Sequence, residues 1–265
     1  MAIKLVAVDM DDTLLDGTLQ VSQRTCEAIA KAHEQGAFVT ICTGRMFSSA
    51  LPFAQKLKIK TPIITYNGGM IRSAFTKEIL FHKTIAHDIA GKIVALFREK
   101  GWYLQSYLND ELYVVERCEK AKLYEKMAGV LAIPVGEKFY SMGHEPTKML
   151  ALAQPQEILE IQKIINKEFA GEIFAATSKA TYLELTHPSV NKGHALGLLA
   201  ESLHISPEEV MAIGDSNNDV PMLEYAGLGV AMGNATDKIK AVAQAVTGHN
   251  NAHGVAEAIE KYVLK

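Results

Sequence analysis

Three carboxylates follow the first apolar run of the chain within four positions, at Asp9, Asp11 and Asp12. The apolar run, residues 5–8, is long enough for one buried strand. Carboxylates crowded this closely repel one another and resist burial, so a cation or a shared proton must compensate them. In an open α/β sheet, ligands bind at the carboxyl ends of the strands. The cluster therefore predicts a cation-dependent ligand site, with a solvated acidic turn as the alternative.

Other polar groups stand at predicted strand ends or helix starts. They are Thr43, which Gly44 follows, Lys192, Asp215 and Asp219. Magnesium takes oxygen ligands and leaves some positions to water and substrate phosphate, which suits Asp9 and Asp215 with Asp219 close behind. A hydroxyl, backbone amides near a glycine and a lysine can hold phosphate oxygens as charge develops. These residue types together predict a phosphoryl-transfer site that uses Mg²⁺.

Each of these signals has a simpler explanation when it is taken alone. Thr43-Gly44-Arg45 suits an ordinary strand-to-helix turn, and Lys192 suits a solvated residue at a helix N-terminus. A lysine at a helix start opposes the macrodipole, however, which favours a functional reason. Arg45 can contact phosphate or pair with a surface acid, and both interpretations stay open.

Several classes of protein are disfavoured by what the sequence lacks. It has no Gly-x-x-x-x-Gly-Lys-Ser/Thr loop and no Gly-x-Gly-x-x-Gly at its first crossover, so neither a nucleoside triphosphatase nor a dinucleotide enzyme is favoured. The three cysteines include no Cys-x-x-Cys pair, which argues against a thiolate zinc site and a disulfide framework.

The segments that must position these groups alternate between strand and helix at both ends of the chain. Strands are predicted at 38–42 and 63–66 after the first one, and the alternation returns from residue 191. This rhythm indicates an α/β fold with a doubly wound, mainly parallel, Rossmann-like sheet.

The middle of the chain has a different order, in which hairpins and helices are mixed. This order is typical of an α+β unit with an antiparallel sheet. We therefore expect a core formed by residues 1–83 and 188–265, with an α+β domain inserted at 84–187.

The composition is that of an ordinary globular protein of 265 residues, 48% hydrophobic and 22% charged, with a net charge of −3. No basic block with interleaved aromatic residues points to a nucleic acid. The apolar start is interrupted at Asp9, and no uncharged apolar stretch reaches the roughly 20 residues that span a bilayer. We expect a cytoplasmic protein with no nucleic-acid or membrane partner, while the oligomeric state stays open.

Four separated motifs, spread over the whole chain, resemble the signature motifs of the haloacid dehalogenase-like phosphatases. They are Asp9-Met-Asp11-Asp12-Thr13-Leu14, Thr43-Gly44-Arg45, Lys192-Gly193, and Gly214-Asp215 with Asn218-Asp219. The large insertion resembles the cap of the Cof-type sugar-phosphate phosphatase subgroup. Two further stretches are similar to that subgroup, Ile64-Thr65-Tyr66-Asn67-Gly68 and Val190-Asn191-Lys192-Gly193.

The resemblance implies a magnesium-dependent phosphoric monoester hydrolase acting on a small phosphorylated metabolite such as a sugar phosphate. Asp9 would attack phosphorus and form an aspartyl-phosphate, and Asp11 would protonate the leaving alcohol and then activate water. The phosphate-binding groups would be Thr43, Gly44, Lys192 and Asn218. The metal-binding groups would be Asp9, the main-chain carbonyl of Asp11, Asp215 and Asp219. Asp219 would act as a ligand, directly or through water, or would orient the other groups.

Asp12 departs from the family pattern, in which glycine is most common at that position. A close-packed backbone there tolerates a side chain only if it points to solvent, so we expect the Asp12 side chain to be exposed and without a catalytic role. In the insertion, Trp102, Tyr107, Glu184 and His187 are candidates for contacts with the substrate, although strand packing explains them equally well.

Two alternatives to a hydrolase remain. A phosphomutase would transfer the same aspartyl-phosphate to a sugar hydroxyl, and a regulatory module would bind metal and phosphate without turnover. The presence of both Asp9 and Asp11 favours an enzyme over the module. The substrate itself stays open, from hexose and pentose phosphates to pyridoxal phosphate and flavin mononucleotide.

Overall fold

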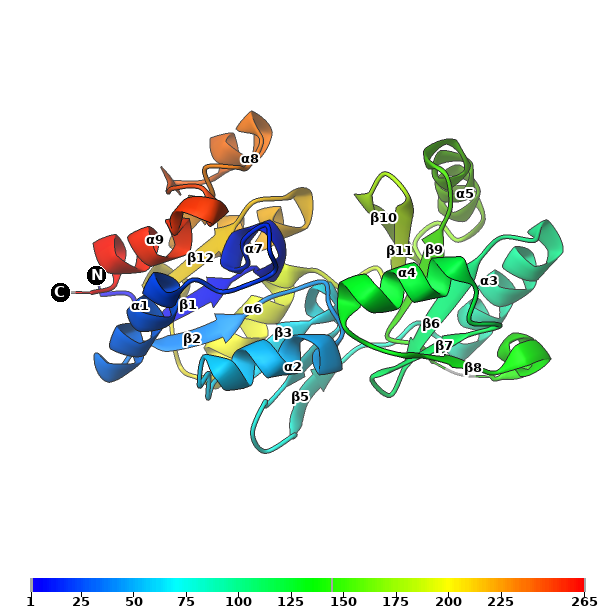
Figure 1. Ribbon diagram of the computed structural model, residues 1–265, viewed down its shortest axis with the longest axis horizontal. Coiled ribbons are helices and arrows are strands. Elements are labelled where there is room, and N and C mark those ends of the chain that lie inside the picture. Colours follow the sequence, from blue (N-terminus) through cyan, green and yellow to red (C-terminus); the bar gives the residue numbers. More distant parts are fainter. Residues whose placement is uncertain (1, 144, 265) are drawn as a thin grey trace. The chain divides into compact units, whose positions relative to one another are not determined.

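The computed structural model describes residues 2–143 and 145–264, and its chain divides into two units (Figure 1). The first, here named the core unit, comprises Met1–Arg45, Ala50–Phe81 and Asn191–Lys265. The second, here named the insert unit, comprises Met46–Ser49 and His82–Val190. Each unit has its own main sheet and its own hydrophobic cluster.

The core unit is built on a five-stranded parallel sheet with the order β14-β13-β12-β1-β2. Its strands are β1 (Leu5–Val8), β2 (Phe38–Ile41), β12 (Val210–Gly214), β13 (Leu228–Ala231) and β14 (Ala245–Val246). Every residue of β1 and β12 is buried. Parallel strands covered on both faces need apolar side chains on both, which explains their continuous apolar runs. The carboxyl ends of β1, β2 and β12 therefore meet at one edge of the sheet.

Six helices accompany this parallel sheet and make it an α/β fold (Figure 1). They are α1 (Gln23–Glu34), α2 (Phe47–Lys56), α6 (Lys192–Ser202), α7 (Val220–Tyr225), α8 (Asp237–Val242) and α9 (Gly254–Tyr262). Apolar side chains of α6, α7 and α8 pack in one cluster with Leu5 and Ala7. Because successive strand residues point to opposite faces, Val6 and Val8 lie on the other side of the sheet. Outside that cluster, α1 packs against β2 and α9.

The third predicted strand joins the parallel sheet only through an isolated parallel bridge, so that expectation is confirmed in part. The strands of a separate three-stranded sheet are β3 (Ile63–Thr65), β4 (Met70–Arg72) and β5 (Ile79–His82). β3 pairs antiparallel with β4, and an isolated bridge from Cys42 to Ile64 links it to the region of β2. Asn67 and Gly68 have positive φ angles of 56° and 102° and turn the chain back on itself. This turn supplies β3 with an antiparallel neighbour.

The insert unit contains a six-stranded sheet with the order β10-β11-β9-β6-β7-β8, antiparallel except between β7 and β8. Its strands are β6 (Leu104–Leu108), β7 (Glu111–Val114), β8 (Ala132–Pro134), β9 (Lys148–Leu152), β10 (Phe174–Lys179) and β11 (Tyr182–Thr186). Its helices are α3 (His87–Lys100), α4 (Glu119–Ala128) and α5 (Pro155–Glu168). Across residues 2–143 and 145–264, no helix combines the length and the apolar character needed to cross a membrane.

The two faces of the insert sheet differ in chemistry. On one face, α3 and α5 bury apolar side chains together with Leu104, Met149 and Leu183. On the other face, Tyr124 of α4 lies edge-on to Tyr107, with 6.3 Å between the ring centroids. The mixed arrangement agrees with the α+β character expected for this part of the chain.

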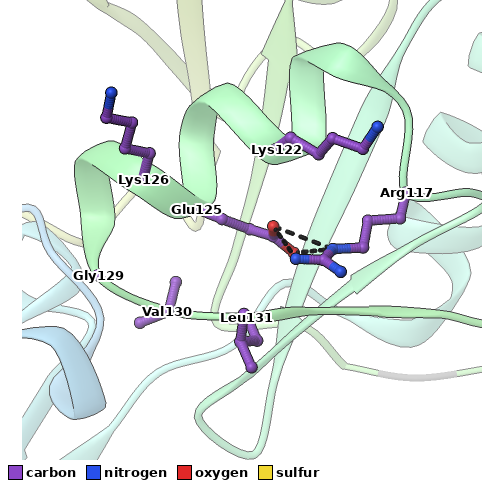
Figure 2. Close-up of a pocket in the computed structure, with 7 residues that line it drawn as sticks. All are labelled: Arg117, Lys122, Glu125, Lys126, Gly129, Val130 and Leu131. Atoms are coloured by element: carbon purple, nitrogen blue, oxygen red, sulfur yellow. Dashed lines mark hydrogen bonds and ion pairs between the residues drawn. The ribbon is translucent and has the colours of Figure 1, made fainter.

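β8 was not predicted from the sequence, because it has three residues, ends in a proline and lies at the sheet edge. A side chain of α4 holds it in place. Glu125 accepts hydrogen bonds from the guanidinium of Arg117 (Figure 2). The same carboxylate accepts the backbone N–H of Ala132 at 2.8 Å and so joins α4 to the first residue of β8. Glu125 and Ala132 are only seven residues apart, but no pattern in the sequence predicts this contact.

Candidate active site

Two acid-bearing strand ends lie side by side in the core unit. Asp9 directly follows β1, Asp215 directly follows β12, and the strands pair in parallel with Val8 opposite Ile213. The backbone N–H of Asp9 donates to the carbonyl of Ile213 at 2.9 Å and extends this pairing by one residue. The sheet therefore brings both acids to the edge where ligands bind in open α/β folds.

Lys192, the first residue of α6, joins the two acidic segments. Its Nζ donates to Oδ1 of Asp9 and to Oδ1 of Asp219, at 2.5 Å in each case. The exposed fraction is 0% for Lys192 and Asp219 and 5% for Asp9. A buried ammonium between two carboxylates rules out the simpler interpretation of Lys192 as a solvated helix residue.

The acidic cluster carries more negative than positive charge. Carboxylate oxygens of Asp9, Asp215 and Asp219 all lie within 4.8 Å of one another, and Lys192 contributes a single positive charge. Three carboxylates in so small a buried space need more compensation than one ammonium provides. Oxygen donors in this arrangement suit a hard divalent cation, so the residues present fit a metal site.

Asp219 is oriented by its own loop. Its Oδ2 accepts the backbone N–H groups of Asp215 at 3.0 Å and Ser216 at 2.9 Å, while its Oδ1 accepts from Lys192. A Cβ atom at Gly214 would come within 2.6 Å of the Asp219 side chain, so only glycine permits this close approach. With both oxygens engaged in this way, Asp219 fixes the positions of Asp215 and Lys192.

The pKa values in the cluster reflect burial and mutual repulsion. Burial, followed by the charge of Asp219, raises the pKa of Asp9 well above its usual range, against the opposing effect of Lys192. Burial and Asp219 also raise the pKa of Asp215, to about 6. Burial alone would lower the pKa of Lys192, but Asp219 and Asp9 outweigh it and raise that pKa overall. A bound cation would relieve this repulsion and favour the ionised carboxylates.

Thr13 also belongs to this site, although sequence reasoning assigned it no role. Its hydroxyl is buried and donates to Oδ1 of Asp215 at 2.9 Å, which lowers the pKa of Asp215 and partly opposes the effect of burial. Thr13 follows the three acids directly in the first motif, but its partner is 202 positions away in the chain. Proximity to the acids was the only signal available in the sequence.

Asp11 is separated from the buried cluster. Arg45 donates to its carboxylate through Nε at 2.9 Å and Nη2 at 2.6 Å, and the side chain of Asp11 is 51% exposed. The guanidinium also lies over the ring of Phe53, 5.8 Å from its centroid. Of the two interpretations left open for Arg45, the structure shows the ion pair with an acid.

Asp12 is exposed, as expected, and its carbonyl accepts the side-chain N–H of Asn234 at 2.8 Å. Its φ of 57° and ψ of 11° are left-handed, a conformation that glycine adopts freely and aspartate tolerates better than most residues. The substitution for the family glycine is therefore compatible with the turn.

The loops that follow β2, β3 and β12 meet beside the acidic cluster. Thr43 is buried, and its Oγ1 accepts the backbone N–H of Arg45 at 3.1 Å. A Cβ atom at Gly44 would lie 2.8 Å from Oδ1 of Asn67, and the same oxygen accepts a hydrogen bond from Asn218 at 3.0 Å. Asn67 thus connects two of the predicted phosphate-binding segments.

The candidates in the insert unit have local partners. Trp102 packs edge-on against Phe97, with 5.5 Å between the ring centroids, which is a packing role. Ser189 donates its backbone N–H to Nδ1 of His187, so the residue stabilises the turn before the chain leaves the insert unit. Tyr107 and Glu184 lie on the polar face of the insert sheet, near Lys148.

Comparisons with known proteins agree with this fold and site. A family model described as haloacid dehalogenase-like hydrolase matches residues 6–259, so the chain belongs to this family. A solved haloacid dehalogenase-like hydrolase from Bacteroides thetaiotaomicron has a TM-score of 0.91 at 27% identity and covers 98% of this chain and 99% of its own. A solved sugar phosphatase of subclass IIB has a TM-score of 0.83 at 25% identity, with coverage of 97% and 98%.

The kind of enzyme follows from named relatives. A Bacillus subtilis protein named 5-amino-6-(5-phospho-D-ribitylamino)uracil phosphatase YcsE is 32% identical, over 99% of this chain and 96% of its own. The protein is a phosphoric monoester hydrolase of the haloacid dehalogenase superfamily, and its resemblance to the Cof-type group is confirmed.

Replacing Lys192 with methionine should destabilise the metal-free protein by about 3 kcal/mol at about pH 8, because the buried carboxylates lose their cation. The loss should be smaller at about pH 5. When the pKa of a carboxylate is higher in the folded protein than in the unfolded one, the free energy of unfolding falls as the pH rises between these two pKa values. Removing Lys192 raises the pKa of the buried carboxylates in the folded protein further, so the loss of stability continues to a higher pH. Urea unfolding in EDTA at both pH values measures the effect.

The matched control is Lys4→Met, which removes a mostly exposed lysine paired with Glu209 and should cost less than about 1 kcal/mol. Equal losses for the Lys192 variant at both pH values would contradict the assignment of the buried carboxylates as the source of the effect.

Proposed function

We propose that the protein is a magnesium-dependent phosphatase that hydrolyses a small phosphorylated metabolite through an aspartyl-phosphate on Asp9. The observation that carries the proposal is the buried Asp9 carboxylate, held by Lys192 and adjacent to Asp215 and Asp219 at the end of two parallel strands. A lysine and a metal next to a carboxylate lower the repulsion between that carboxylate and an incoming phosphate dianion.

The metal-binding groups in this proposal are the carboxylates of Asp9 and Asp215 and the main-chain carbonyl of Asp11. Asp219 orients Asp215 and Lys192, or binds the metal, directly or through water. Mg²⁺ suits oxygen ligands of this kind and would neutralise charge on the phosphate when bound. The donors Thr43, Gly44, Lys192 and Asn218 would hold the phosphate oxygens.

The reaction divides into two displacements at phosphorus. A carboxylate oxygen of Asp9 forms a bond to phosphorus while the ester oxygen leaves, and Asp11 gives that oxygen a proton. Water then attacks the aspartyl-phosphate, Asp11 takes a proton from it, and Asp9 is released with inorganic phosphate. Asp11 must leave its pair with Arg45 to do this, and because the Asp11 side chain is 51% exposed, water can take the place of the guanidinium.

We further propose that residues 1–83 and 188–265 form the catalytic core and that residues 84–187 determine which substrate is used. The substrate class favoured is a phosphate ester of a sugar or related polyol. Support comes from the solved sugar phosphatase and from the phosphoribityl substrate in the name of the Bacillus subtilis relative. In the insert sheet, Tyr107, Lys148 and Glu184 provide groups that suit several hydroxyls.

Asp9→Asn should reduce phosphate release from p-nitrophenyl phosphate by at least about a thousandfold, because an amide is a poor nucleophile. Removing metal with EDTA should abolish the activity, and adding Mg²⁺ should restore it. The control is Asp12→Asn, a neighbouring exposed carboxylate, which should retain most of the activity. Activity that persists in Asp9→Asn would overturn the nucleophile assignment, and absence of turnover on a broad ester panel would favour a binding module.

Asp11→Asn should affect substrates according to their leaving group. With an alkyl phosphate, the loss should be about 10²- to 10⁴-fold, because the alkoxide needs a proton. With p-nitrophenyl phosphate, the first step should continue and the second should slow, giving a rapid burst of p-nitrophenolate of about one equivalent. Rapid-mixing absorbance measures the burst. Equal losses on both substrates without a burst would contradict the acid and base role of Asp11.

The concentration of Mg²⁺ that gives half-maximal activity should rise about tenfold for each pH unit below about 6. The pKa of Asp215 is raised to about 6, so below this pH a proton occupies the carboxylate and competes with the metal, while above it the carboxylate is free. Thr13→Val removes a hydrogen bond that lowers this pKa, and should shift the transition to higher pH. A Mg²⁺ requirement independent of pH in both proteins would contradict the role of Asp215.

A further inference from the structure

The turn between β3 and β4 has three consecutive residues in the left-handed region. The φ angles of Tyr66, Asn67 and Gly68 are 54°, 56° and 102°. Glycine adopts such angles freely and asparagine is enriched there, but a bulky, fully buried residue such as Tyr66 is an outlier. A backbone of this kind costs free energy and persists only where its surroundings hold it. The groups that this turn contacts therefore indicate its role.

The turn holds the loop after β2 at both ends. Asn67 donates its backbone N–H to the carbonyl of Thr43 at 3.0 Å. Tyr66 donates its backbone N–H to the carbonyl of Arg45 at 2.9 Å. Between these two bonds, the Asn67 side chain lies against Gly44, where an added Cβ atom would be 2.8 Å from Oδ1. The backbone around Gly44, which is proposed to hold phosphate, is therefore fixed by the turn.

The same side chain reaches the loop after β12. Oδ1 of Asn67 accepts a hydrogen bond from Nδ2 of Asn218 at 3.0 Å. The other end of the Asn218 amide is also held, because its Oδ1 accepts from the hydroxyl of Ser216 at 2.6 Å. An amide nitrogen carries two N–H groups, so the bond to Asn67 uses one of them and orients the other. Asn67 thus sets the direction in which Asn218 can donate.

The third neighbour of the turn is the start of α6. A Cβ atom at Gly68 would overlap the carbonyl oxygen of Asn191, so only glycine permits this approach. Asn191 is the N-cap of α6, and its side chain accepts the backbone N–H of His194 at 2.8 Å. Lys192 follows directly. The turn therefore lies against all three loops that carry the proposed phosphate-binding groups.

We infer that Asn67 is a positioning residue for phosphate binding, which aligns Gly44 and Asn218 through its single side-chain oxygen. This inference rests on the proposed function, because it takes Gly44 and Asn218 as groups that hold the phosphate of the substrate. Asparagine suits the position because it tolerates the left-handed backbone and also offers an amide oxygen. Without that oxygen, the loops after β2 and β12 lose their link and each phosphate must order them anew.

Asn67→Gly removes the side chain but keeps the left-handed backbone accessible. The KM for p-nitrophenyl phosphate and the inhibition constant of inorganic phosphate should each rise about tenfold, while kcat changes less than about threefold. Such a split is expected because Gly44 and Asn218 hold the phosphate both before and during the reaction. Calorimetric titration of inorganic phosphate in Mg²⁺ should show the same loss of affinity without any turnover.

The matched control is Asn109→Gly, the same substitution at an exposed left-handed asparagine, with φ of 50°, in the hairpin between β6 and β7. It should leave the KM and the phosphate affinity unchanged. A double-mutant cycle with Asn218→Ala tests whether Asn67 acts through its partner. The double variant should lose clearly less phosphate affinity than the product of the two single losses, because both remove the same hydrogen bond.

Phosphate affinity of Asn67→Gly within about twofold of the unaltered protein would overturn the inference and leave the proposed function intact. Losses that simply multiply in the double variant, or a fall in kcat at unchanged KM, would also overturn it. If the unaltered protein neither hydrolyses phosphate esters nor binds phosphate, the proposed function fails and the inference fails with it.

Discussion

The contact of Lys192 with Asp9 and Asp219 is the interaction on which the rest of the site depends. It joins residues 183 and 27 positions apart, and all three are removed from solvent. A buried ammonium without these partners would be strongly unfavourable. Three features of the fold bring these charges together. β1 pairs with β12, α6 begins at Lys192, and the chain returns to the core unit after the insertion. The residual negative charge then makes the same place suitable for a cation.

The three N-terminal acids differ because the backbone turns between them. Asp9 extends the strand pairing and stays buried, while Asp11 points to the side where Arg45 lies. Asp12 follows in a left-handed conformation, and its side chain is exposed. Two aspartates so close in the chain thus differ through burial and partners. Burial raises the pKa of Asp9, whereas the half-exposed carboxylate of Asp11 forms an ion pair with Arg45.

The insert unit divides its chemistry between the two faces of one sheet. Alternation along β6 places Leu104 and Ser106 on the face covered by helices, and Gln105 and Tyr107 on the other. Gln105 donates to the hydroxyl of Tyr107 at 2.8 Å, so this polar face has its own hydrogen-bond network.

The sequence by itself determined the fold class and the placement of the acids, because both depend on local patterns. Apolar runs ending in Asp9 and Asp215 indicate buried parallel strands with polar carboxyl ends, and alternation with helices indicates how they are connected. Only the tertiary structure decided the antiparallel pairing of β3, the short strand β8 and the partners of Thr13 and Arg45. These features depend on contacts between residues far apart in the chain. Hydrophobic periodicity is a local pattern, so it does not indicate which distant residue a turn, a hydroxyl or a guanidinium contacts.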